Sequence, residues 1–356
     1  MLNVALTFDY ELFFGENYGT HDEIIFNPTN ELLDLLDKYN VKATFFADVL
    51  SVYMHNKYGL TDYSEKFTNQ IKDMVKRGHD VQLHIHSNWL KSEYKNGKWF
   101  FDQDSYRVHS FGFDNTAEFS VDKLVKWGKS YLCDTLKPIN KNYDCIAYRA
   151  GGYCVQPHKE LFSVLLDNGI FLDSSVAIGQ FSNGTNSYDF KDITNRVAWW
   201  CDINGELKDR CAPSPTAVYE LPIGGIKPSL FRRVFSPKKE KNLIQKSMRG
   251  SYIGSSTTKK APTKKANIII RILNYGKGLR MLTCDSANYA LLIQGLNKAA
   301  MVNKNGDVSV IGHPKLIDDE WLKNFESLLI ALKESKKCTT TTVLQIGNNA
   351  KLNKNI

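Results

Sequence analysis

The chain of 356 residues places polar side chains directly after short apolar runs, where they could do chemistry. Asp9 and Glu11 follow the run NVALTF, residues 3–8. Residues two apart in an extended chain point to the same side, and two neighbouring carboxylates repel unless a cation or an arginine lies between them. The pair is therefore either part of a cation site or a solvated pair in a loop.

A second candidate is the stretch HDVQLHIHSNW, residues 79–89. In an extended chain His84 and His86 face one side, and Asn88 shares that face. Imidazoles together with a carboxylate are common ligands of zinc and similar ions, and the carbonyl oxygen of Asn88 would be a poorer ligand. A His-x-His pair also occurs among structural histidines, so the spacing alone leaves both interpretations open.

Arg149 and His313 complete the set. Arg149 ends the run CIAYR and precedes AGG, a flexible turn that lets the backbone approach a ligand. Its guanidinium can hold a carboxylate by two hydrogen bonds, although a surface arginine is the alternative. His313 ends the run SVIG, and its pKa range suits general acid chemistry, although a loop histidine without a role is equally simple. Considered together, acids, imidazoles and a guanidinium after four apolar runs predict one site.

These residues lie at the ends of predicted strands in a chain that alternates strands and helices. The predicted strands are 3–8, 41–47, 80–86, 145–149, 170–175, 217–223, 279–284 and 307–312. The predicted helices are 27–40, with Asn27 as N-cap and Pro28 in the first turn, then 64–78, 119–135, a helix after Pro157, 287–300 and 318–334. Such alternation predicts a parallel α/β sheet covered by helices. Seven or so units favour a barrel, with its chemistry at the C-terminal ends of the strands.

Composition sets the broad class of the protein. A hydrophobic fraction of 42% is ordinary for a globular chain with a sizeable core. The first residues, MLNVALTFDYELFF, lack the features of a signal peptide, and no run of about 18 apolar residues predicts a membrane span. Seven scattered cysteines fit reduced thiols better than disulfides. We therefore expect a cytoplasmic location.

The net charge of +8 is concentrated in one segment. Residues 227–280 hold fifteen Lys and Arg and one acid, so they carry +14 and the rest of the chain carries −6. Their composition predicts a mobile insertion, either simply solvated or attracted to an anionic membrane surface or a pyrophosphate group. No nucleic-acid motif accompanies the charge, so nucleic acid is not an expected partner. We assign residues 1–340, with this insertion, to one domain and 341–356 to a C-terminal tail.

The order of the motifs resembles that of the polysaccharide deacetylase family, the chitin-deacetylase-like carbohydrate esterases of family four. LTFDYE resembles the family's Thr-Phe-Asp-Asp motif, and VKATFFADV resembles its Ala-Thr-Phe-Phe-Val strand. RGHDVQLHIHSNW resembles Gly-His-Glu-Ile-Gly-Asn-His-Thr-x-x-His, and YRAGGY resembles Phe-Arg-Pro-Pro-Tyr. LDSSV resembles the segment that lines the substrate groove, and VIGHPK takes the place of the late Leu-His motif. The resemblance runs from residue 3 to about 335, except for the basic segment.

This resemblance implies an irregular barrel of about seven β/α units that removes N- or O-acetyl groups from sugars with one divalent metal ion, usually zinc. Asp9 would be the general base, held by Arg149. His84 would be the first metal histidine, and His313 would be the general acid.

Two positions depart from the family pattern. Tyr10 stands where the metal carboxylate usually follows the base, so Glu11 is its nearest substitute. Asn88 stands where the second metal histidine is usually found, four residues after His84. Either His86 replaces that histidine or Asn88 is itself a weak ligand.

The expected function is a metal-dependent hydrolase that removes an acetyl group, foremost an N-acetyl group, from a sugar or glycan intermediate in polysaccharide biosynthesis. The substrate could be pyrophosphate- or lipid-linked, with peripheral contact between the enzyme and an anionic membrane. The alternatives are a metal-free amidohydrolase of the same fold and a non-catalytic glycan-binding relic. Residues that could stack on sugar rings, or simply belong to the core, are Trp89, Trp199, Trp200 and Tyr153.

Overall fold

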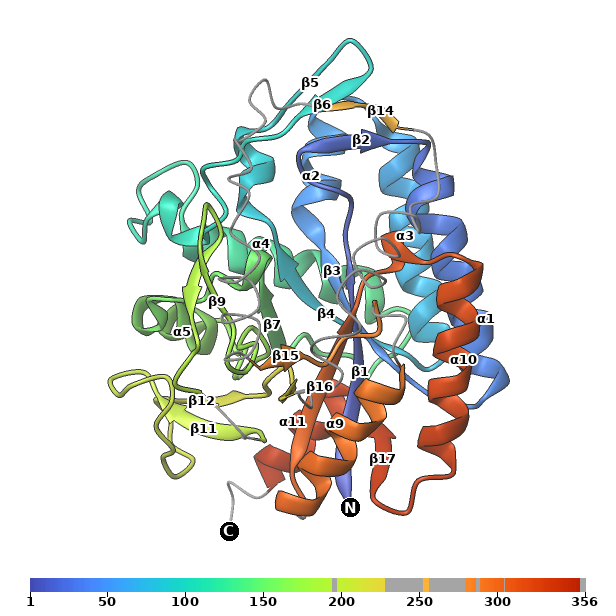
Figure 1. Ribbon diagram of the computed structural model, residues 1–356. Coiled ribbons are helices and arrows are strands. Elements are labelled where there is room, and N and C mark those ends of the chain that lie inside the picture. The colour runs from blue at the N-terminus through green and yellow to red at the C-terminus, as the bar shows by residue number, and fades with distance from the viewer. Residues whose placement is uncertain (194–196, 228–251, 256–278, 286–288, 304, 353–356) are drawn as a thin grey trace, which may run out of the picture.

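Strands and helices alternate around a curled sheet in the computed structural model (Figure 1), which describes residues 1–193, 197–227, 252–255, 279–285, 289–303 and 305–352. Within these residues nine strands form the main sheet, in the order β11-β12-β8-β7-β4-β3-β1-β16, with β17 also paired to β1. Their bounds are β1 Leu2–Tyr10, β3 Thr44–Asp48, β4 Asp80–Ile85, β7 Ala147–Ala150, β8 Leu172–Asp173, β11 Trp199–Asp202, β12 Ala217–Glu220, β16 Asp307–Gly312 and β17 Cys338–Thr341.

The sheet closes on itself. Every pairing in it is parallel except that between β11 and β12. Beyond the ends of β8 and β12, single parallel bridges join Ala177 to Ile223 and Ile223 to Ser309 of β16, which is itself paired with β1. The predicted α/β barrel is therefore confirmed, and its strands end together at the upper side in Figure 1.

Helices pack around the outside of this sheet (Figure 1). They are α1 Asn27–Lys38, α2 Val49–Lys57, α3 Thr61–Lys76, α4 Val121–Leu136, α5 His158–Asp167, α9 Tyr289–Val302, α10 Asp319–Lys333 and α11 Val343–Leu352. The sequence-based prediction missed α2, which follows β3 without a loop. It also misplaced the start of α1. The π-helical turn η1, Asp22–Phe26, continues directly into α1. Asn27 is therefore the first residue of α1 and not the N-cap of that helix, whereas Pro28 does lie in its first turn.

The segment expected to be a C-terminal tail contains α11, which covers the lower end of the barrel. Val343 and Ile346 are buried in an apolar cluster with Phe46 and Ile146. The backbone N–H of Val343 donates to the hydroxyl of Thr44 over 2.9 Å. This helix therefore packs as part of the domain.

Short elements form the loops above the strands. The hairpin β5 Glu93–Lys95 with β6 Lys98–Phe100, and the pair β2 Glu16–Tyr18 with β14 Tyr252–Ser255, lie at the top of Figure 1. A second hairpin joins β9 Phe181–Asn183 to β10 Ser187–Asp189, and β13 Gly225–Ile226 pairs with β15 Arg280–Met281. Short 3-10 turns follow three strands: η2 Ser87–Lys91, η4 Gly151–Tyr153 and η5 Pro314–Leu316, and η3 Val108–Phe111 precedes α4. Most of the basic insertion predicted at 227–280 lies outside the described residues.

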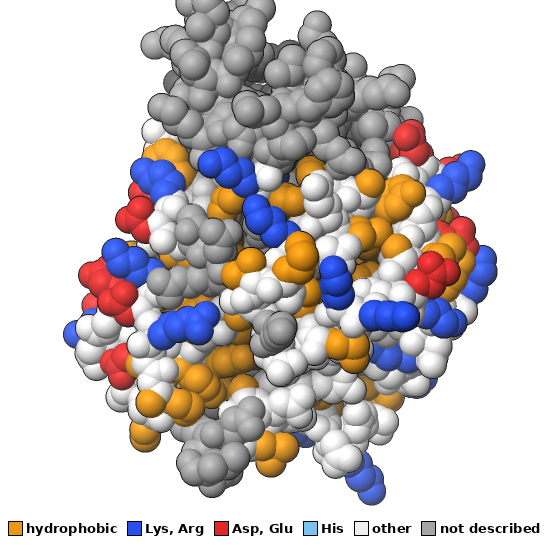
Figure 2. All heavy atoms as spheres, turned by 60° about the horizontal axis from the view of Figure 1, so that its bottom comes forward, with side chains coloured by type: hydrophobic (Ala, Val, Ile, Leu, Met, Phe, Trp, Pro, Cys, Tyr) orange, Lys and Arg blue, Asp and Glu red, His pale blue; other side chains and the backbone are white. Residues whose placement is uncertain are grey.

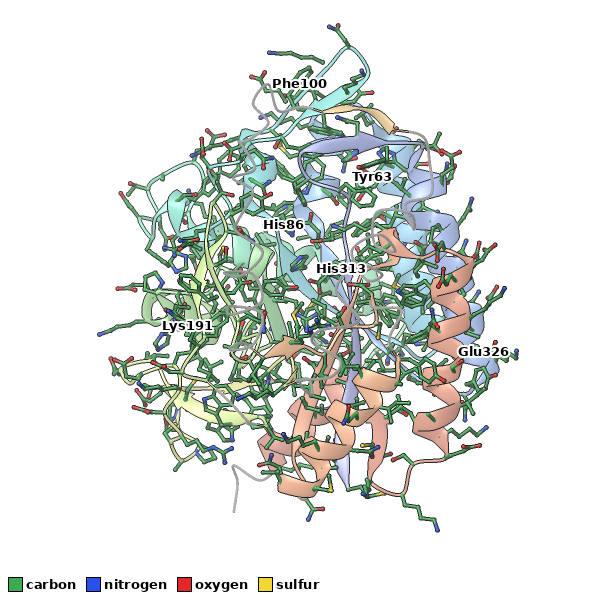
Figure 3. The ribbon with its side chains drawn as sticks, viewed as in Figure 1. Tyr63, His86, Phe100, Lys191, His313 and Glu326 are labelled. Atoms are coloured by element: carbon green, nitrogen blue, oxygen red, sulfur yellow. The ribbon has the colours of Figure 1, made fainter. Side chains whose placement is uncertain are left out.

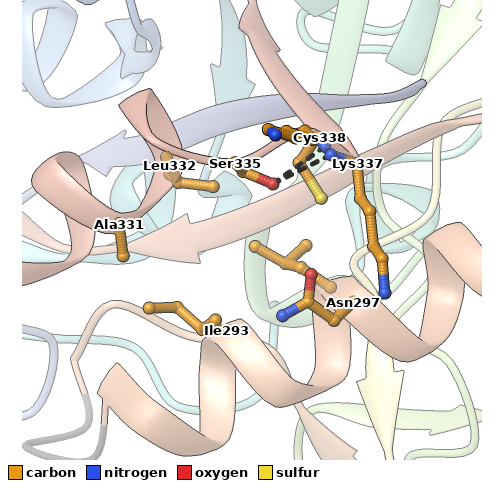
Figure 4. A pocket seen from close by; sticks show the side chains of 9 residues that line it. Ile293, Asn297, Ala331, Leu332, Ser335, Lys337 and Cys338 are labelled. Atoms are coloured by element: carbon orange, nitrogen blue, oxygen red, sulfur yellow. Dashed lines mark hydrogen bonds between the residues drawn. The ribbon is translucent and has the colours of Figure 1, made fainter.

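The lower end of the barrel carries none of the predicted chemistry. A cavity of about 270 Å³ lies there between α9 and α10, where the Ser335 hydroxyl accepts the backbone N–H groups of Lys337 and Cys338 (Figure 4). On the face in Figure 2, which brings this end forward, the Lys and Arg side chains of the described residues are scattered among apolar and acidic ones. No described helix has the length and apolar character needed to cross a bilayer.

Candidate active site

Side chains from four strands of the sheet meet at the upper end of the barrel. β1 supplies Asp9 and leads into Glu11, β4 supplies His84 and leads into His86, β7 supplies Arg149, and β16 leads into His313. Figure 3 places His86 and His313 in the middle of the molecule, above the strands. The parallel sheet brings these residues together because all four strands end at one edge, as the sequence-based prediction requires.

Glu11, His84 and His86 form a compact, buried cluster. One carboxylate oxygen of Glu11, Oε2, lies 2.9 Å from Nε2 of His84 and 2.5 Å from Nε2 of His86. One ligand atom from each residue lies within 4.8 Å of the other two, a spacing that suits a shared metal ion. Two imidazoles and one carboxylate form a donor set of the kind that zinc and similar ions prefer.

The hydrogen bonds of His84 identify which of its two nitrogens faces the cluster. Its Nδ1 lies 2.8 Å from the backbone carbonyl of Arg149, which can only accept, so Nδ1 carries a proton. In the neutral ring Nε2 then carries a lone pair that faces the Glu11 carboxylate. Two such acceptors repel each other unless a proton or a metal ion lies between Nε2 and the carboxylate oxygen. Burial alone would lower the pKa of His84, but the carboxylates of Asp9 and Glu11 raise it to about 9, so a proton fills this role when metal is absent.

His86 is held by packing more than by hydrogen bonds. Its ring stacks on Phe14 with the centroids 4.2 Å apart, and its backbone N–H donates to Asp48 over 3.2 Å. A Cβ atom built on Gly151 would lie 2.9 Å from Nδ1 of His86, so only glycine leaves room for this ring. Nδ1 itself has no hydrogen-bond partner within the described residues.

Asp9 and Arg149 form a buried ion pair beside the cluster. The guanidinium donates to Asp9 Oδ1 over 2.6 Å, and to the carbonyl and hydroxyl of Ser174 over 2.8 and 2.9 Å. It crosses the barrel interior over the ring of Phe46, 4.1 Å from the ring centroid. The second oxygen of Asp9, Oδ2, lies 4.0 Å from Nε2 of His84 and 3.8 Å from Nε2 of His313. Arg149 therefore fixes one oxygen and leaves the other facing the cluster.

His313 is paired with an acid that the sequence analysis missed. Asp285 accepts the backbone N–H of His313 over 2.9 Å and lies 2.7 Å from its Nδ1. Burial alone would lower the pKa of His313, but Asp285 outweighs this and raises it. Since Nδ1 donates to Asp285, Nε2 is the atom that faces the cluster, where it lies 3.7 Å from Glu11 Oε1.

Comparisons with known proteins bear on the fold and on the first part of the chain. Residues 3–102 match the family model described as polysaccharide deacetylase. No curated protein matches the chain in sequence. A crystal structure described as a putative polysaccharide deacetylase from Mycobacterium smegmatis superimposes with a TM-score of 0.50 at 12% identity, over 99% of this chain and 91% of the other. The 4-alpha-glucanotransferase of Thermococcus litoralis gives 0.50 at 10% identity, over 98% of this chain and 40% of its own.

The segment matched by this family model, residues 3–102, contains Asp9, Glu11, His84 and His86. The superposition on the Mycobacterium smegmatis structure shows a shared barrel fold. The family-model match agrees with the class of enzyme expected from the sequence, a carbohydrate deacetylase. The likeness to the glucanotransferase concerns only the fold of this chain. The same barrel fold can carry unrelated active sites.

Asn88, the other predicted ligand, is not one of the three residues that form the cluster. It is fully buried in η2, where its side-chain amide donates to the carbonyl of Asp102 over 3.1 Å. Its Oδ1 has no hydrogen-bond partner within the described residues. His86, two residues earlier, lies against Glu11 instead. A role for Asn88 as a further weak ligand stays a prediction.

Two of the aromatic residues considered for sugar stacking have structural roles instead. Trp89 is fully buried and donates its indole N–H to Asp48 over 2.6 Å. Trp199 is buried and donates to the carbonyl of Leu207 over 3.1 Å. Trp200 is largely buried in the lower apolar cluster. Tyr153, with a φ of 64°, follows Arg149 by four residues and stays a candidate.

A second cation at the cluster also escaped the sequence analysis. Lys315, in the turn η5 directly after His313, donates to Glu11 Oε1 over 2.6 Å. Burial alone would raise the pKa of Glu11, but Lys315 and the two imidazoles hold it well below its usual value. The only sequence signal for this lysine was the motif GHPK, in which Lys315 lies two residues after His313, the expected general acid.

Proposed function

We propose that the protein is a metal-dependent deacetylase that hydrolyses the N-acetyl group of a sugar or glycan. The observation that carries the proposal is the tautomer of His84. Its outer nitrogen donates to the Arg149 carbonyl, so its inner nitrogen is left as a ligand beside Glu11 and His86. Zinc is the ion that this donor set favours.

The residues around the cluster suit the hydrolysis of an amide. When bound, the metal ion supplies Lewis acidity, which polarises the acetyl carbonyl and acidifies a water molecule. Asp9 is the general base, because Arg149 fixes one of its oxygens and the other faces the cluster. His313 is the general acid, because Asp285 orients it and raises its pKa, which favours the protonated form whose Nε2 can protonate the leaving amine.

One cavity is lined by residues that follow Glu11 in the chain, although none of the proposed catalytic or metal-binding side chains lines it. It has a volume of about 360 Å³ and opens beside Leu12 and Phe13. Its walls include the aromatic side chains of Tyr18, Tyr94 and Trp99. Aromatic faces with a polar rim are suited to sugar rings, which present apolar C–H faces and polar hydroxyl edges.

Metal binding tests the proposal. Protein purified without chelator should bind about one zinc-class ion per chain, and His84→Ala should lose most of it, because first ligands have no substitute in a buried site. His109→Ala is the matched control, since His109 lies outside the cluster and bonds to the carbonyl of Pro157. Full metal content in His84→Ala would remove the cluster from the proposal.

One observation favours a second candidate, the metal-free amidohydrolase. Lys315 donates to Glu11, and the neighbouring carboxylates raise the pKa of His84 to about 9, so Lys315 and a protonated His84 can compensate the charge of Glu11 without a metal ion. Acetate release that survives exhaustive chelation would favour this candidate. Absence of both metal binding and hydrolysis would leave the non-catalytic glycan-binding relic.

A further inference from the structure

The two carboxylate oxygens of Glu11 contact different partners, and Lys315 binds one of them. Its ammonium group donates to Oε1 over 2.6 Å and to the carbonyl of Leu12 over 3.0 Å. The same group lies 5.3 Å from the centroid of the Phe13 ring. The other oxygen, Oε2, faces His84 and His86. One oxygen of Glu11 therefore belongs to the lysine and the other to the metal-binding cluster.

The lysine is held in place by its neighbours. Pro314 precedes it at the start of η5, and the ring fixes the backbone there. His313, just before, is tied to Asp285 through both its backbone and its side chain. The Lys315 side chain is only 11% exposed. The general acid and the lysine are thus delivered to the cluster by one turn.

Two physical effects follow for a metal ion bound to Oε2. A carboxylate whose other oxygen is taken by an ammonium group binds through one oxygen only and donates less electron density. The ammonium charge also repels a divalent ion. At a separation on the order of 5 Å this repulsion changes a binding constant about tenfold even at the dielectric constant of bulk water. The orientation that Lys315 gives Glu11 has a smaller effect on the metal-binding constant than the charge has, because this carboxylate is already packed among buried groups.

We propose that Lys315 is a positioning residue that keeps Glu11 a one-oxygen ligand, and that its charge, the larger effect, makes the cluster bind its metal ion less tightly and leaves that ion a stronger Lewis acid. This inference rests on the proposed metal-dependent function. It predicts that affinity and turnover change in opposite directions. Removal of the lysine should tighten metal binding and slow catalysis.

The test compares the full-length wild type with Lys315→Met at pH 7. The affinity for Co²⁺ and Zn²⁺, measured by competition with a chromogenic chelator, should rise at least tenfold in the variant. The visible absorption of the Co²⁺ form should weaken, because Glu11 becomes free to add its second oxygen and raise the coordination number. Turnover of an N-acetylated sugar should fall 10- to 100-fold, the usual effect of a residue that supports a metal ligand.

Three further variants separate charge from packing. Lys315→Arg keeps the charge and should bind metal within about threefold of the wild type. Lys315→Gln keeps N–H donors without the charge, so it should show the same tightening and replaces Lys315→Met if that variant does not fold. Lys91→Met, in the neighbouring turn η2, removes a lysine that contacts Phe111 rather than the cluster, and should change nothing.

The outcomes distinguish this inference from the proposed function. If the wild type binds Co²⁺ and the uncharged variants bind it equally or more weakly, the inference is wrong and the metal-dependent function stands. If the wild type itself binds neither ion, both are wrong. Tighter binding with slower turnover in both uncharged variants supports the inference.

Discussion

Replacing Arg149 with methionine should destabilise the protein as well as silence its site. The guanidinium is fully buried, donates to Asp9 and Ser174, and lies over the ring of Phe46. Its removal leaves the Asp9 carboxylate, itself only 3% exposed, without its cation. Breaking a buried ion pair from one side typically costs about 3–5 kcal/mol. We expect a loss of this size in the free energy of unfolding.

A double-mutant cycle with Asp9→Asn measures how much of this loss belongs to the pair. Asp9→Asn leaves the guanidinium without its anion, whereas the double variant leaves neither charge unpaired. The double variant should therefore lose about 2 kcal/mol less than the sum of the two single losses. Urea denaturation of all four proteins, in the presence of a chelator, gives the coupling energy. Losses that add within about 0.5 kcal/mol would refute the reasoning, because independent residues behave in that way.

Three other predictions concern the acid, the core and the basic segment. Asp285→Asn should lower turnover and shift the alkaline limb of its pH profile to lower pH, because the carboxylate that raises the pKa of the general acid His313 is lost. An unchanged profile would contradict the pairing. Burial lowers the pKa of His55 to about 3, and the neutral ring both donates to Ser51 and accepts from Trp99. Because the pKa of His55 in the folded protein lies below the unfolded value of 6.5, the neutral ring stabilises the fold above pH 6.5. This contribution to the free energy of unfolding falls by about 2 kcal/mol between pH 7 and 5. In denaturation curves His55→Gln should lose less stability over this pH range than the wild type, and an equal loss in both proteins would contradict the prediction. Neutralising six lysines of the basic segment should weaken binding to anionic vesicles or to a pyrophosphate-linked substrate, and this effect should shrink as the salt concentration rises. Hydrolysis of a small uncharged acetyl-sugar should stay unchanged. If the wild type shows no salt-sensitive binding to either anion, the segment is simply a solvated loop. The six lysines are Lys238, Lys239, Lys259, Lys260, Lys264 and Lys265.

Much of the fold could be predicted because buried parallel strands leave a strong pattern. The runs that became β1, β3, β4 and β16 are short, apolar and followed by polar residues, so both the strands and the edge where chemistry gathers were visible. α2 was missed because it follows β3 directly, with no turn residue to mark its start. α11 was missed because a short amphipathic stretch near the end of a chain resembles a tail until its burial is seen.

The candidate site was predictable only in part. Residues two apart on a strand share a face, and this local rule is enough to pair Asp9 with Glu11 and His84 with His86. The contact of Lys315 with Glu11 joins positions 304 residues apart, and no periodicity reports such a contact. Asp285 was hidden for the same reason, since its partner His313 lies 28 residues further along the chain.

Acetate release from N-acetylglucosamine oligomers tests the central claim most directly. We expect hydrolysis by the wild type to stop when metal is removed by dialysis against a chelator, and to return with about one equivalent of Zn²⁺ or Co²⁺ per chain. His84→Ala should stay inactive at the same metal concentration. Hydrolysis that continues without metal, or that His84→Ala retains at the wild-type rate, would contradict a catalytic metal ion bound by Glu11, His84 and His86.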